Sequence, residues 1–398
     1  MIDIPSVEQT HSSGAVPRRG VTIVRASGAH LFDGTGRRWV DCSAAHGWAA
    51  LGHSHPAVTE AIRSQAGRIV MLTESATNDA RARWYATLTE FLGREFPETG
   101  RGPLWRISAA NSGAEAIEGA LKFARFHTGR PGVVAFTRGF HGRTFGALSA
   151  TAPSPRTERF APLVPGFSHA TYNDLSAADS AVGDGTGAII VEVIQGEGGV
   201  HEGTTEFLKG LERLAHERGA LLIVDEIQTG FGRTGRWFAS AWHELNPDII
   251  VLGKAIGGGL PLGAAVWRKE LGGFDPGLHG STFAAAPLVC AASVAAMEAL
   301  TAEDLASRAD RLGRAAFARL QALTQTKSIM VRAVRGRGLM IGIELKGKVS
   351  PVIERLMERG VWALPAGLNV LRLLPPLNIP EADLDFALDA VTEVLRGE

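Results

Sequence analysis

Short, continuous runs of hydrophobic residues recur along the middle of the chain. They are rich in valine and isoleucine and end at turn residues, a pattern that predicts strands buried on both faces of a sheet. The runs span residues 105–109, 133–136, 188–194, 221–224 and 249–252, with a return strand at 263–267. Between them lie stretches with helical spacing of hydrophobic positions, such as 206–218. Strands that alternate with helices indicate βαβ units, so we predict an α/β fold with a mostly parallel sheet.

The two ends of the chain follow other patterns. Residues 1 to about 20 are polar and interrupted by proline and glycine, which predicts a poorly ordered arm. Short strands around turns are predicted next, before a helix from Pro56 to Ala66. These strands span residues 21–25, 30–32 and 38–40. Beyond residue 287 the pattern predicts long helices at 288–300 and 305–323, then strands and a helix at 339–345, 352–359 and 370–374.

These patterns divide the chain into three parts. Residues 1–50 are expected to form an N-terminal arm and part of a small domain, and 51–286 a large domain. Residues 287–398 are expected to form the C-terminal small domain. This smaller α+β domain should therefore collect elements from both chain ends.

Two of the buried runs end in charged residues. Asp225 follows the run at 221–224, and Lys254 follows the run at 249–252. Side chains beyond the carboxyl ends of parallel strands face the crevice in which α/β sheets bind ligands. An acid and an amine delivered there fit pyridoxal 5'-phosphate (PLP), which takes a lysine Schiff base and an acidic partner at its pyridine nitrogen.

A turn between a predicted strand and a helix offers a second candidate binding feature. The strand at 105–109 leads into Asn111-Ser112-Gly113-Ala114-Glu115, after which a helix begins. Small residues at such a turn let backbone N–H groups approach an anion, and the helix N-terminus favours phosphate. The alternative is that Ser112 only caps its own helix.

Composition narrows the possible classes of protein. The chain has 398 residues, of which 45% are hydrophobic, and Lys plus Arg equal Asp plus Glu at 41 each. Such a balance gives no field that favours nucleic acid or an anionic membrane. The two cysteines, Cys42 and Cys290, argue against a disulfide framework. Because no signal-like segment and no apolar run of about 18 residues occurs, we expect a cytoplasmic protein.

Several motifs together resemble one enzyme family. In chain order they read NSGAEAIEGALKFAR, FHGRTFGALSAT, VEVIQGEGGV, DEIQTGFGRTG, LGKAIGGGLPLGA, HGSTF and NVLRLLPPL. This order is typical of class III aminotransferases, PLP enzymes of fold type I that include the acetylornithine, ornithine and 4-aminobutyrate aminotransferases. The similarity extends from about residue 20 to the C-terminus. It implies the type I fold, PLP as the cofactor and a homodimer with shared active sites.

The resemblance assigns catalytic roles to the two strand-end residues. Lys254 would form the Schiff base with the cofactor and then move the proton at the reacting carbon. Asp225 would pair with the pyridine nitrogen, and Gln228 would hydrogen-bond the phenolic oxygen. The simpler alternatives are a solvated lysine for Lys254 and turn caps for the other two.

The resemblance also implies the rest of the cofactor site. Ser112, Gly113 and Ala114 match the phosphate-binding turn, whereas Thr282 matches a threonine that reaches the phosphate of the neighbouring subunit. Phe140 would stack on the pyridine ring, with a core phenylalanine as the alternative. His141 would shape the site, with a structural histidine as the alternative, and Glu192 is interpreted as a hydrogen-bonding residue behind the site. The pair His53 and His55 lacks acidic or cysteine partners at ligand spacing, so we interpret it as a turn and predict no metal site.

Substrate recognition is expected to rest on charged residues. Arg372 matches the arginine that grips the substrate α-carboxylate, which a guanidinium can do with two hydrogen bonds. Glu197 matches the glutamate that pairs with this arginine when an ω-amino donor enters. Arg143 matches a second arginine for a distal carboxylate or an acyl tail. For each of the three, the alternative is a solvated surface charge.

Three departures from the family pattern affect the expected substrate more than the cofactor. Val193 replaces a common proline, and Ala284-Ala285-Ala286 replaces the usual GGNP-type continuation after HGSTF. The segment Ala44-Ala45-His46-Gly47-Trp48 lacks the aromatic and apolar pattern of the arginine-biosynthetic members. The last two segments fall on or near the expected substrate pocket and dimer seam.

The sequence therefore predicts an aminotransferase that passes an amino group from an amino acid or ω-amino donor to a 2-oxo acid such as 2-oxoglutarate. Two half-reactions in one site imply ping-pong kinetics. One alternative is a PLP enzyme that epimerises, decarboxylates or eliminates, because the fold alone does not fix the reaction. Another is a catalytically silent binding or scaffold protein that retains the fold.

Overall fold

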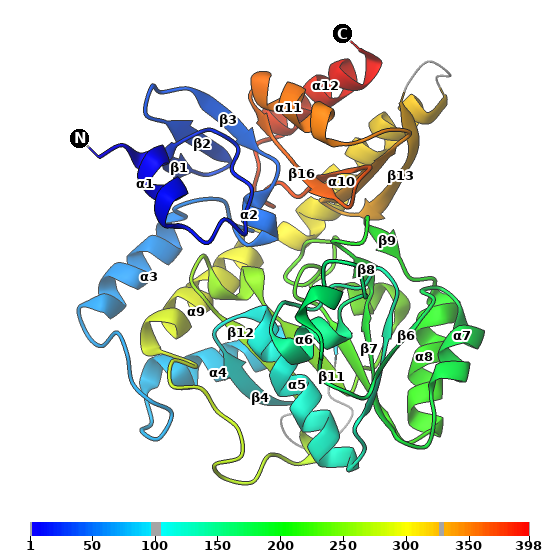
Figure 1. The fold of residues 1–398 in the computed structure, drawn as a ribbon. Helices are drawn as coiled ribbons and strands as arrows, with labels where there is room; N and C mark the ends of the chain where they lie inside the picture. The colour runs from blue at the N-terminus through cyan, green and yellow to red at the C-terminus, as the bar shows by residue number, and fades with distance from the viewer. Residues whose placement is uncertain (1, 97–104, 326–329, 398) are drawn as a thin grey trace.

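A seven-stranded sheet forms the centre of the larger part of the molecule (Figure 1). The computed structural model describes residues 2–96, 105–325 and 330–397. The strands follow the spatial order β4 (Trp105–Ala110), β12 (Gly263–Arg268), β11 (Ile249–Leu252), β10 (Leu221–Asp225), β7 (Thr186–Glu192), β5 (Gly132–Phe136) and β6 (Phe167–Ala170). Neighbouring strands from β11 to β6 are parallel, whereas β12, the predicted return strand, is antiparallel to both of its neighbours.

Both faces of this sheet are covered by helices. On one face, α5 (Gly113–Thr128) packs with alternate strand residues such as Ile190 and Ile223. On the other face, α8 (Thr205–Glu217) packs with the residues between them, such as Ile189 and Val224. Successive side chains of a strand point to opposite faces, so a strand covered twice must be apolar throughout. This explains why the strands appear in the sequence as continuous hydrophobic runs.

Two smaller sheets lie above this layer and combine both chain ends (Figure 1). The first contains β1 (Ile23–Ser27), β2 (His30–Asp33) and β3 (Arg38–Asp41), with β15 (Val361–Trp362) added in parallel to β3. The second is antiparallel, in the order β13 (Val331–Arg337), β14 (Met340–Leu345), β17 (Val370–Leu373) and β16 (Leu364–Ala366). The domain boundaries at residues 50 and 286 stay a prediction.

Helices complete both parts of the molecule. Around the smaller sheets lie α10 (Leu305–Gln321), α11 (Ser350–Glu358) and α12 (Glu381–Arg396). The helices α3 (Pro56–Ala66), α4 (Asp79–Gly93) and α9 (Pro287–Ala302) pack together, and Trp84 Nε1 donates a hydrogen bond to Ser293 Oγ at 3.0 Å. Shorter helices are α2 (Ala44–Gly47), α6 (Phe145–Ala150) and α7 (Leu175–Ala181). Among the described helices, none is long and apolar enough to cross a membrane.

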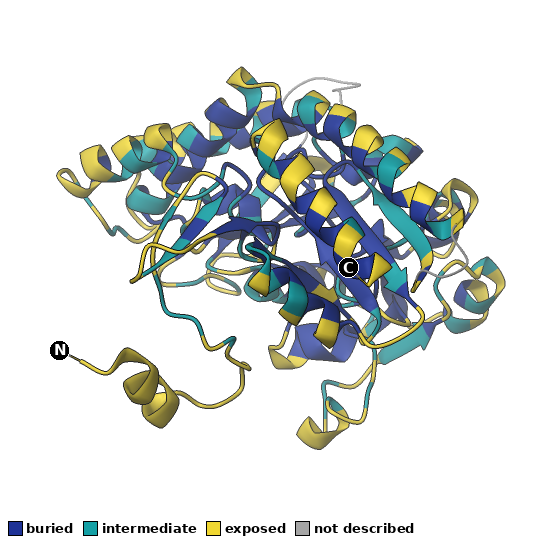
Figure 2. Ribbon diagram, turned by 90° about the horizontal axis from the view of Figure 1, so that it is seen from above, coloured by how far each residue is buried: buried dark blue, intermediate teal, exposed yellow. Residues whose placement is uncertain are grey.

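Two predictions about local structure were wrong. The N-terminal arm contains a helix, α1 (Ile4–His11), which the side chain of Asp3 caps and Pro5 favours at its first turn. No residue of α1 is buried, and the arm extends away from the body (Figure 2). The run at 188–194 is not one strand, because β7 ends at Glu192 and β8 (Ile194–Gln195) pairs instead with β9 (His201–Glu202).

Candidate active site

The candidate site lies at the carboxyl ends of the parallel strands. Asp225 is the last residue of β10 and lies beside Glu192, the last residue of β7, in the parallel register. Lys254 follows β11 and begins the short helix η3 (Lys254–Gly257) with a φ of 48°. Positive φ values are uncommon for residues with side chains, and such strain clusters at active sites. The topology therefore brings the predicted acid and amine to one edge of the sheet.

Two hydrogen bonds orient the carboxylate of Asp225. His141 Nδ1 lies 2.8 Å from Asp225 Oδ2, and the backbone N–H of Ile227 donates to Oδ1 at 2.9 Å. Both His141 and Asp225 are buried. Burial by itself lowers the pKa of His141, but the hydrogen bond to Asp225 and its charge outweigh burial and raise that pKa. His141 therefore acts as a donor that fixes Asp225 in one orientation.

Glu192 connects two loops that border the site. Its Oε2 accepts from the backbone N–H of Phe140 at 2.9 Å, and its Oε1 accepts from Gly196 at 3.2 Å. Burial disfavours the charged form and raises the pKa of Glu192 to about 7. Glu192 thus positions the segment that carries Phe140 and the loop that carries Glu197.

The structure brings Arg372, Glu197 and Gln228 together. Arg372 Nη1 lies 2.7 Å from Glu197 Oε1 and 3.1 Å from Gln228 Oε1, and it also donates to the Gly196 carbonyl at 2.7 Å. The Arg372 side chain is fully buried, and its Nε and Nη2 atoms have no partner among the described residues. Burial by itself raises the pKa of Glu197, but the charge of Arg372 outweighs it and lowers that pKa. An ionised Glu197 therefore compensates a buried guanidinium.

The position of Gln228 depends on a glycine. A Cβ atom at Gly196 would overlap the Gln228 side chain, starting with Oε1. Gln228 Nε2 also lies 3.4 Å from Glu197 Oε1, so the amide contacts both members of the ion pair. Only glycine at residue 196 leaves Gln228 this place beside Arg372.

Lys254 lies among these charges. Desolvation lowers the pKa of its amine, the charge of Glu197 opposes that shift, and the charge of Arg372 adds to it. No described residue forms a hydrogen bond with its amine. The amine is therefore nearer to its neutral, nucleophilic form than a solvated lysine.

The N-terminus of α5 leaves backbone donors available. Ser112 Oγ caps the helix by accepting from Glu115 N at 3.2 Å, while Asn111 N donates to Glu115 Oε2 at 2.6 Å. The backbone N–H groups of Gly113 and Ala114 have no acceptor within the described chain. Ser112 therefore forms the cap that was the alternative interpretation, and the turn still presents two free donors to an anion.

Three of the expected site residues are not fully buried. Phe140 is half-buried, and the guanidinium of Arg143 lies 5.9 Å from the centre of its ring. Arg143 is exposed, and within the described chain it forms no hydrogen bond or ion pair with Arg372 or Glu197. Thr282 is exposed as well, next to Ser281, whose hydroxyl accepts from Asn111 Nδ2 at 2.8 Å.

The comparisons with known proteins agree with this geometry. The family model described as "Aminotransferase class-III" matches residues 12–395. The chain belongs to this family. It is 39% identical to acetylornithine aminotransferase of Methanothermobacter thermautotrophicus, over 99% of this chain and 98% of the relative. It is 40% identical to LysW-aminoadipate semialdehyde transaminase of Deinococcus radiodurans, over 98% of this chain and 90% of the relative.

Solved structures give the same result. The ornithine aminotransferase of Toxoplasma gondii ME49 superposes with a TM-score of 0.91 at 32% identity, over 99% of this chain and 94% of the other. A second structure of the Toxoplasma gondii enzyme is described with PLP at its active site. The predicted type I fold is thus confirmed, and this aminotransferase is a PLP-dependent enzyme.

The described residues fit PLP. A buried carboxylate held by two hydrogen bonds, Asp225, suits the protonated pyridine nitrogen. The amine of Lys254, with its lowered pKa, suits the aldehyde. The free N–H groups at the start of α5 suit the phosphate.

One residue near the substrate side was not predicted from the sequence. Desolvation lowers the pKa of His46, and the charges of Glu197, Arg372 and Lys254 all act on its imidazole. His46 lies in α2, a turn in which Ala44, Ala45 and His46 have φ values of 41°, 49° and 63°. The only sequence signal was the unusual composition of this segment, because a left-handed turn without asparagine has no pattern that marks it.

The histidine pair near residue 54 bonds to carboxylates. His53 Nε2 lies 2.8 Å from Asp41 Oδ2, and His55 Nε2 lies 3.1 Å from Glu303 Oε1. Both contacts connect the turn before α3 to the rest of the fold.

Proposed function

We propose that this aminotransferase accepts the terminal amino group of an ω-amino donor and passes it to a dicarboxylic 2-oxo acid such as 2-oxoglutarate. The observation that carries the proposal is the contact between the buried Arg372 and Glu197 at 2.7 Å. The relatives named for acetylornithine and for LysW-aminoadipate semialdehyde support this class of donor.

The ion pair can adapt to two differently shaped substrates. An α-amino acid such as glutamate presents an α-carboxylate, which takes the free Nη2 atom of Arg372 together with Nη1 and so displaces Glu197 from Nη1. An ω-amino donor has no carboxylate at that carbon. Leaving a buried charge unpaired costs about 3–5 kcal/mol, so Glu197 must return to Arg372 when this donor binds.

The other site residues serve the proton transfer. Bound PLP supplies an electron sink for the carbanion at the substrate carbon. Lys254 accepts the proton from this carbon and returns it, because desolvation lowers the pKa of its amine. Asp225 provides the acidic partner for the pyridine nitrogen, and His141 holds it in place.

The tail of the donor is proposed to extend toward the outer residues of the site. Arg143 is exposed beside Phe140 and can pair with a distal carboxylate. His46 lies near the Arg372 and Glu197 pair and can accept or donate a hydrogen bond to the same tail. A donor with an acylated α-amino group and a free carboxylate has groups for both.

A panel of amino donors tests the function. The purified, PLP-loaded enzyme should convert both N-acetylornithine and glutamate, each measured alone by the change in cofactor absorbance. Initial rates with 2-oxoglutarate should give parallel double-reciprocal lines, as ping-pong kinetics require. Conversion of glutamate but of no ω-amino donor, or intersecting lines, would overturn the proposal.

We also propose that two copies of the chain form the active enzyme. The exposed Thr282 and its neighbour Phe283, which is 64% exposed, support this. Thr282 matches the family's threonine that reaches the phosphate of the neighbouring subunit, and its exposure in a single chain fits that role. Sedimentation of the purified protein measures its mass, and a monomer would contradict the proposal. The cytoplasmic location stays a prediction.

A further inference from the structure

The loop that carries Glu197 belongs to a small hairpin outside the main sheet. Strands β8 and β9 pair through Ile194 with Glu202 and Gln195 with His201, and residues 196–200 connect them. The hairpin lies at the junction of the two parts of the molecule, directly below β13 (Figure 1). Its conformation therefore depends on contacts from the small sheets as well as from the large one.

Arg335 of β13 contacts the hairpin at two points. Its Nε donates to the carbonyl of Gly199 at 2.7 Å, and its Nη2 lies 3.3 Å from His201 Nε2. Its Nη1 donates to Glu344 Oε2 at 2.5 Å, which fixes the guanidinium. Desolvation, together with the charges of Arg335 and Arg138, lowers the pKa of His201 to about 4. His201 is therefore neutral at physiological pH and accepts a hydrogen bond from the arginine.

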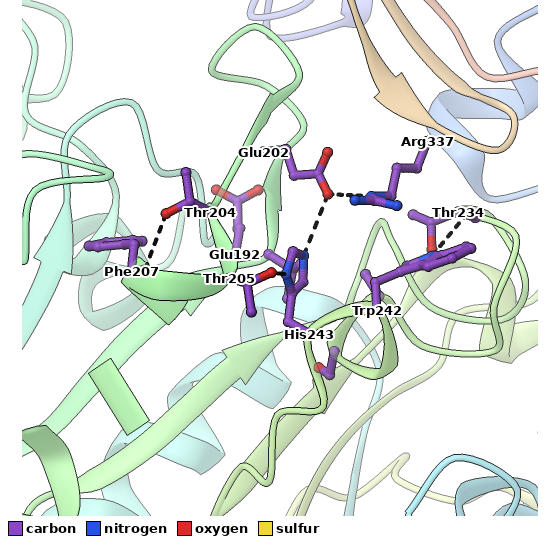
Figure 3. Close-up of polar contacts among 12 residues, drawn as sticks. Glu192, Glu202, Thr204, Thr205, Phe207, Thr234, Trp242, His243 and Arg337 are labelled. Atoms are coloured by element: carbon purple, nitrogen blue, oxygen red, sulfur yellow. Dashed lines mark hydrogen bonds and ion pairs between the residues drawn. The ribbon is translucent and has the colours of Figure 1, made fainter. Parts of the chain in front are cut away.

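A second arginine of the same strand binds the end of the hairpin (Figure 3). Arg337 forms an ion pair with Glu202, and its guanidinium lies 4.8 Å from the centre of the Trp242 ring. His243 Nε2 lies 3.5 Å from the same carboxylate, and its Nδ1 lies 2.8 Å from Thr205 Oγ1. Glu202 thus joins β13 to His243, which follows β10 in the larger part of the molecule.

The loop itself is under strain. Val200 is fully buried and has a φ of 57°, which is an outlier for a β-branched residue. Its side chain packs over β14, where a Cβ atom at Gly342 would lie 2.7 Å from Val200 Cβ. Strained backbone persists only where its surroundings determine it. Here the surroundings are β13 and β14 on one side and Arg372, which holds Gly196, on the other.

We propose that Arg335 and Arg337 are positioning residues that set Glu197 against Arg372, so that β13 controls the balance between the two half-reactions. The inference rests on the proposed function, in which Glu197 must close over Arg372 for an ω-amino donor. Among the described residues, neither arginine forms a hydrogen bond or ion pair with Arg372, Glu197 or Lys254. Both act through the hairpin backbone.

The two half-reactions should respond differently when these contacts are lost. With a looser hairpin, Glu197 pairs less often with Arg372, which leaves the guanidinium uncompensated when an ω-amino donor binds. Glutamate supplies its own carboxylate to Arg372, so its half-reaction becomes easier when Glu197 is more readily displaced. The ratio of kcat/KM for N-acetylornithine to kcat/KM for glutamate therefore measures how well the hairpin positions Glu197. A general loss of activity would lower both values of kcat/KM and leave their ratio unchanged.

The test compares Arg335→Met with Arg332→Met. Arg332 lies on the same strand and binds the same Glu344, at 3.1 Å, but it forms no hydrogen bond or ion pair with the described residues of the hairpin. Arg335→Met should lower the ratio about tenfold or more, because charge-assisted hydrogen bonds are lost. Arg332→Met should leave the ratio unchanged, and Glu197→Gln should lower it further. Amide hydrogen exchange of residues 196–203 in the protein without PLP should be faster in Arg335→Met only.

Each outcome bears on one proposal. If wild-type enzyme converts both donors and Arg335→Met keeps the wild-type ratio, the positioning role is wrong and the proposed function stands. If wild-type enzyme converts no ω-amino donor, the proposed function fails before the variants are compared. Should Arg335→Met not fold, Glu202→Gln removes the Arg337 contact from the hairpin side, and an unchanged ratio there also overturns the inference.

Discussion

Individual buried charges define this site. Asp225, Glu192 and Arg372 are all buried, and each has partners that hydrogen-bond it or compensate its charge. Burying an unpaired charge is costly. The partners therefore have structural roles as well as the catalytic roles proposed for them.

Glu192 gives a prediction about pH. Its folded pKa of about 7 lies above the ordinary 4.5 because burial disfavours the carboxylate. Between these values the folded protein retains a proton that the unfolded chain has lost, so stability decreases as pH rises. Urea unfolding of the protein without PLP measures the free energy of unfolding. This free energy should decrease more from pH 5 to pH 7.5 in the wild type than in Glu192→Gln. We expect a difference on the order of 1–3 kcal/mol.

A second variant, Glu344→Gln, distinguishes the contribution of Glu192 from a pH dependence that any lost carboxylate would cause. The hydrogen bond from Arg335 lowers the pKa of Glu344, so its contribution to stability is lost only as pH falls below the ordinary value. Glu344→Gln should keep the wild-type slope between pH 5 and 7.5. Equal slopes in wild type and Glu192→Gln would contradict the assignment to Glu192.

The strands of the central sheet are the elements that position the catalytic residues. β10 and β11 end at Asp225 and just before Lys254, and every residue of both strands is buried. Their hydrophobic residues could be recognised from the sequence because both faces of the sheet are covered. The end of β7 could not, since hydrophobicity continues through Val193 and Ile194 while the hydrogen bonding passes to β9.

Core substitution tests the role of β10. Ile223 is fully buried in the central strand, and Ile223→Ala should lower the free energy of unfolding by about 2–5 kcal/mol. Ile4→Ala in the exposed helix α1, where Ile4 is 45% exposed, should change it by less than about 0.5 kcal/mol. Denaturant titration measures both. Similar costs at the two positions would show that α1 is packed in solution.

At the scale of the whole molecule, the proposed dimer makes each site depend on two chains. Lys254→Ala should be inactive, and Thr282→Asp should be weakened by repulsion of the cofactor phosphate. Mixed dimers of these variants contain one intact site, assembled from Lys254 of one chain and Thr282 of the other. Refolding the two together at equal amounts should therefore restore about a quarter of the wild-type activity.

A different result is expected if each site is built from one chain alone. Activity of the mixture would then equal the mean of the two variants measured separately. Mixing the folded variants without dissociation serves as the control, because exchange of subunits is needed for restoration.

The sequence by itself determined the order of strands and helices, the family, and the two residues at strand ends, Asp225 and Lys254. These depend on local hydrophobic periodicity and on short motifs, which are visible along the chain. The pairing of Glu197 with Arg372 was expected from the resemblance. The tertiary structure decided that Gln228 joins this pair, that His46 lies beside it, and that β13 holds the β8–β9 hairpin. Such contacts join residues far apart in the chain, and they form only when the two parts of the molecule pack together.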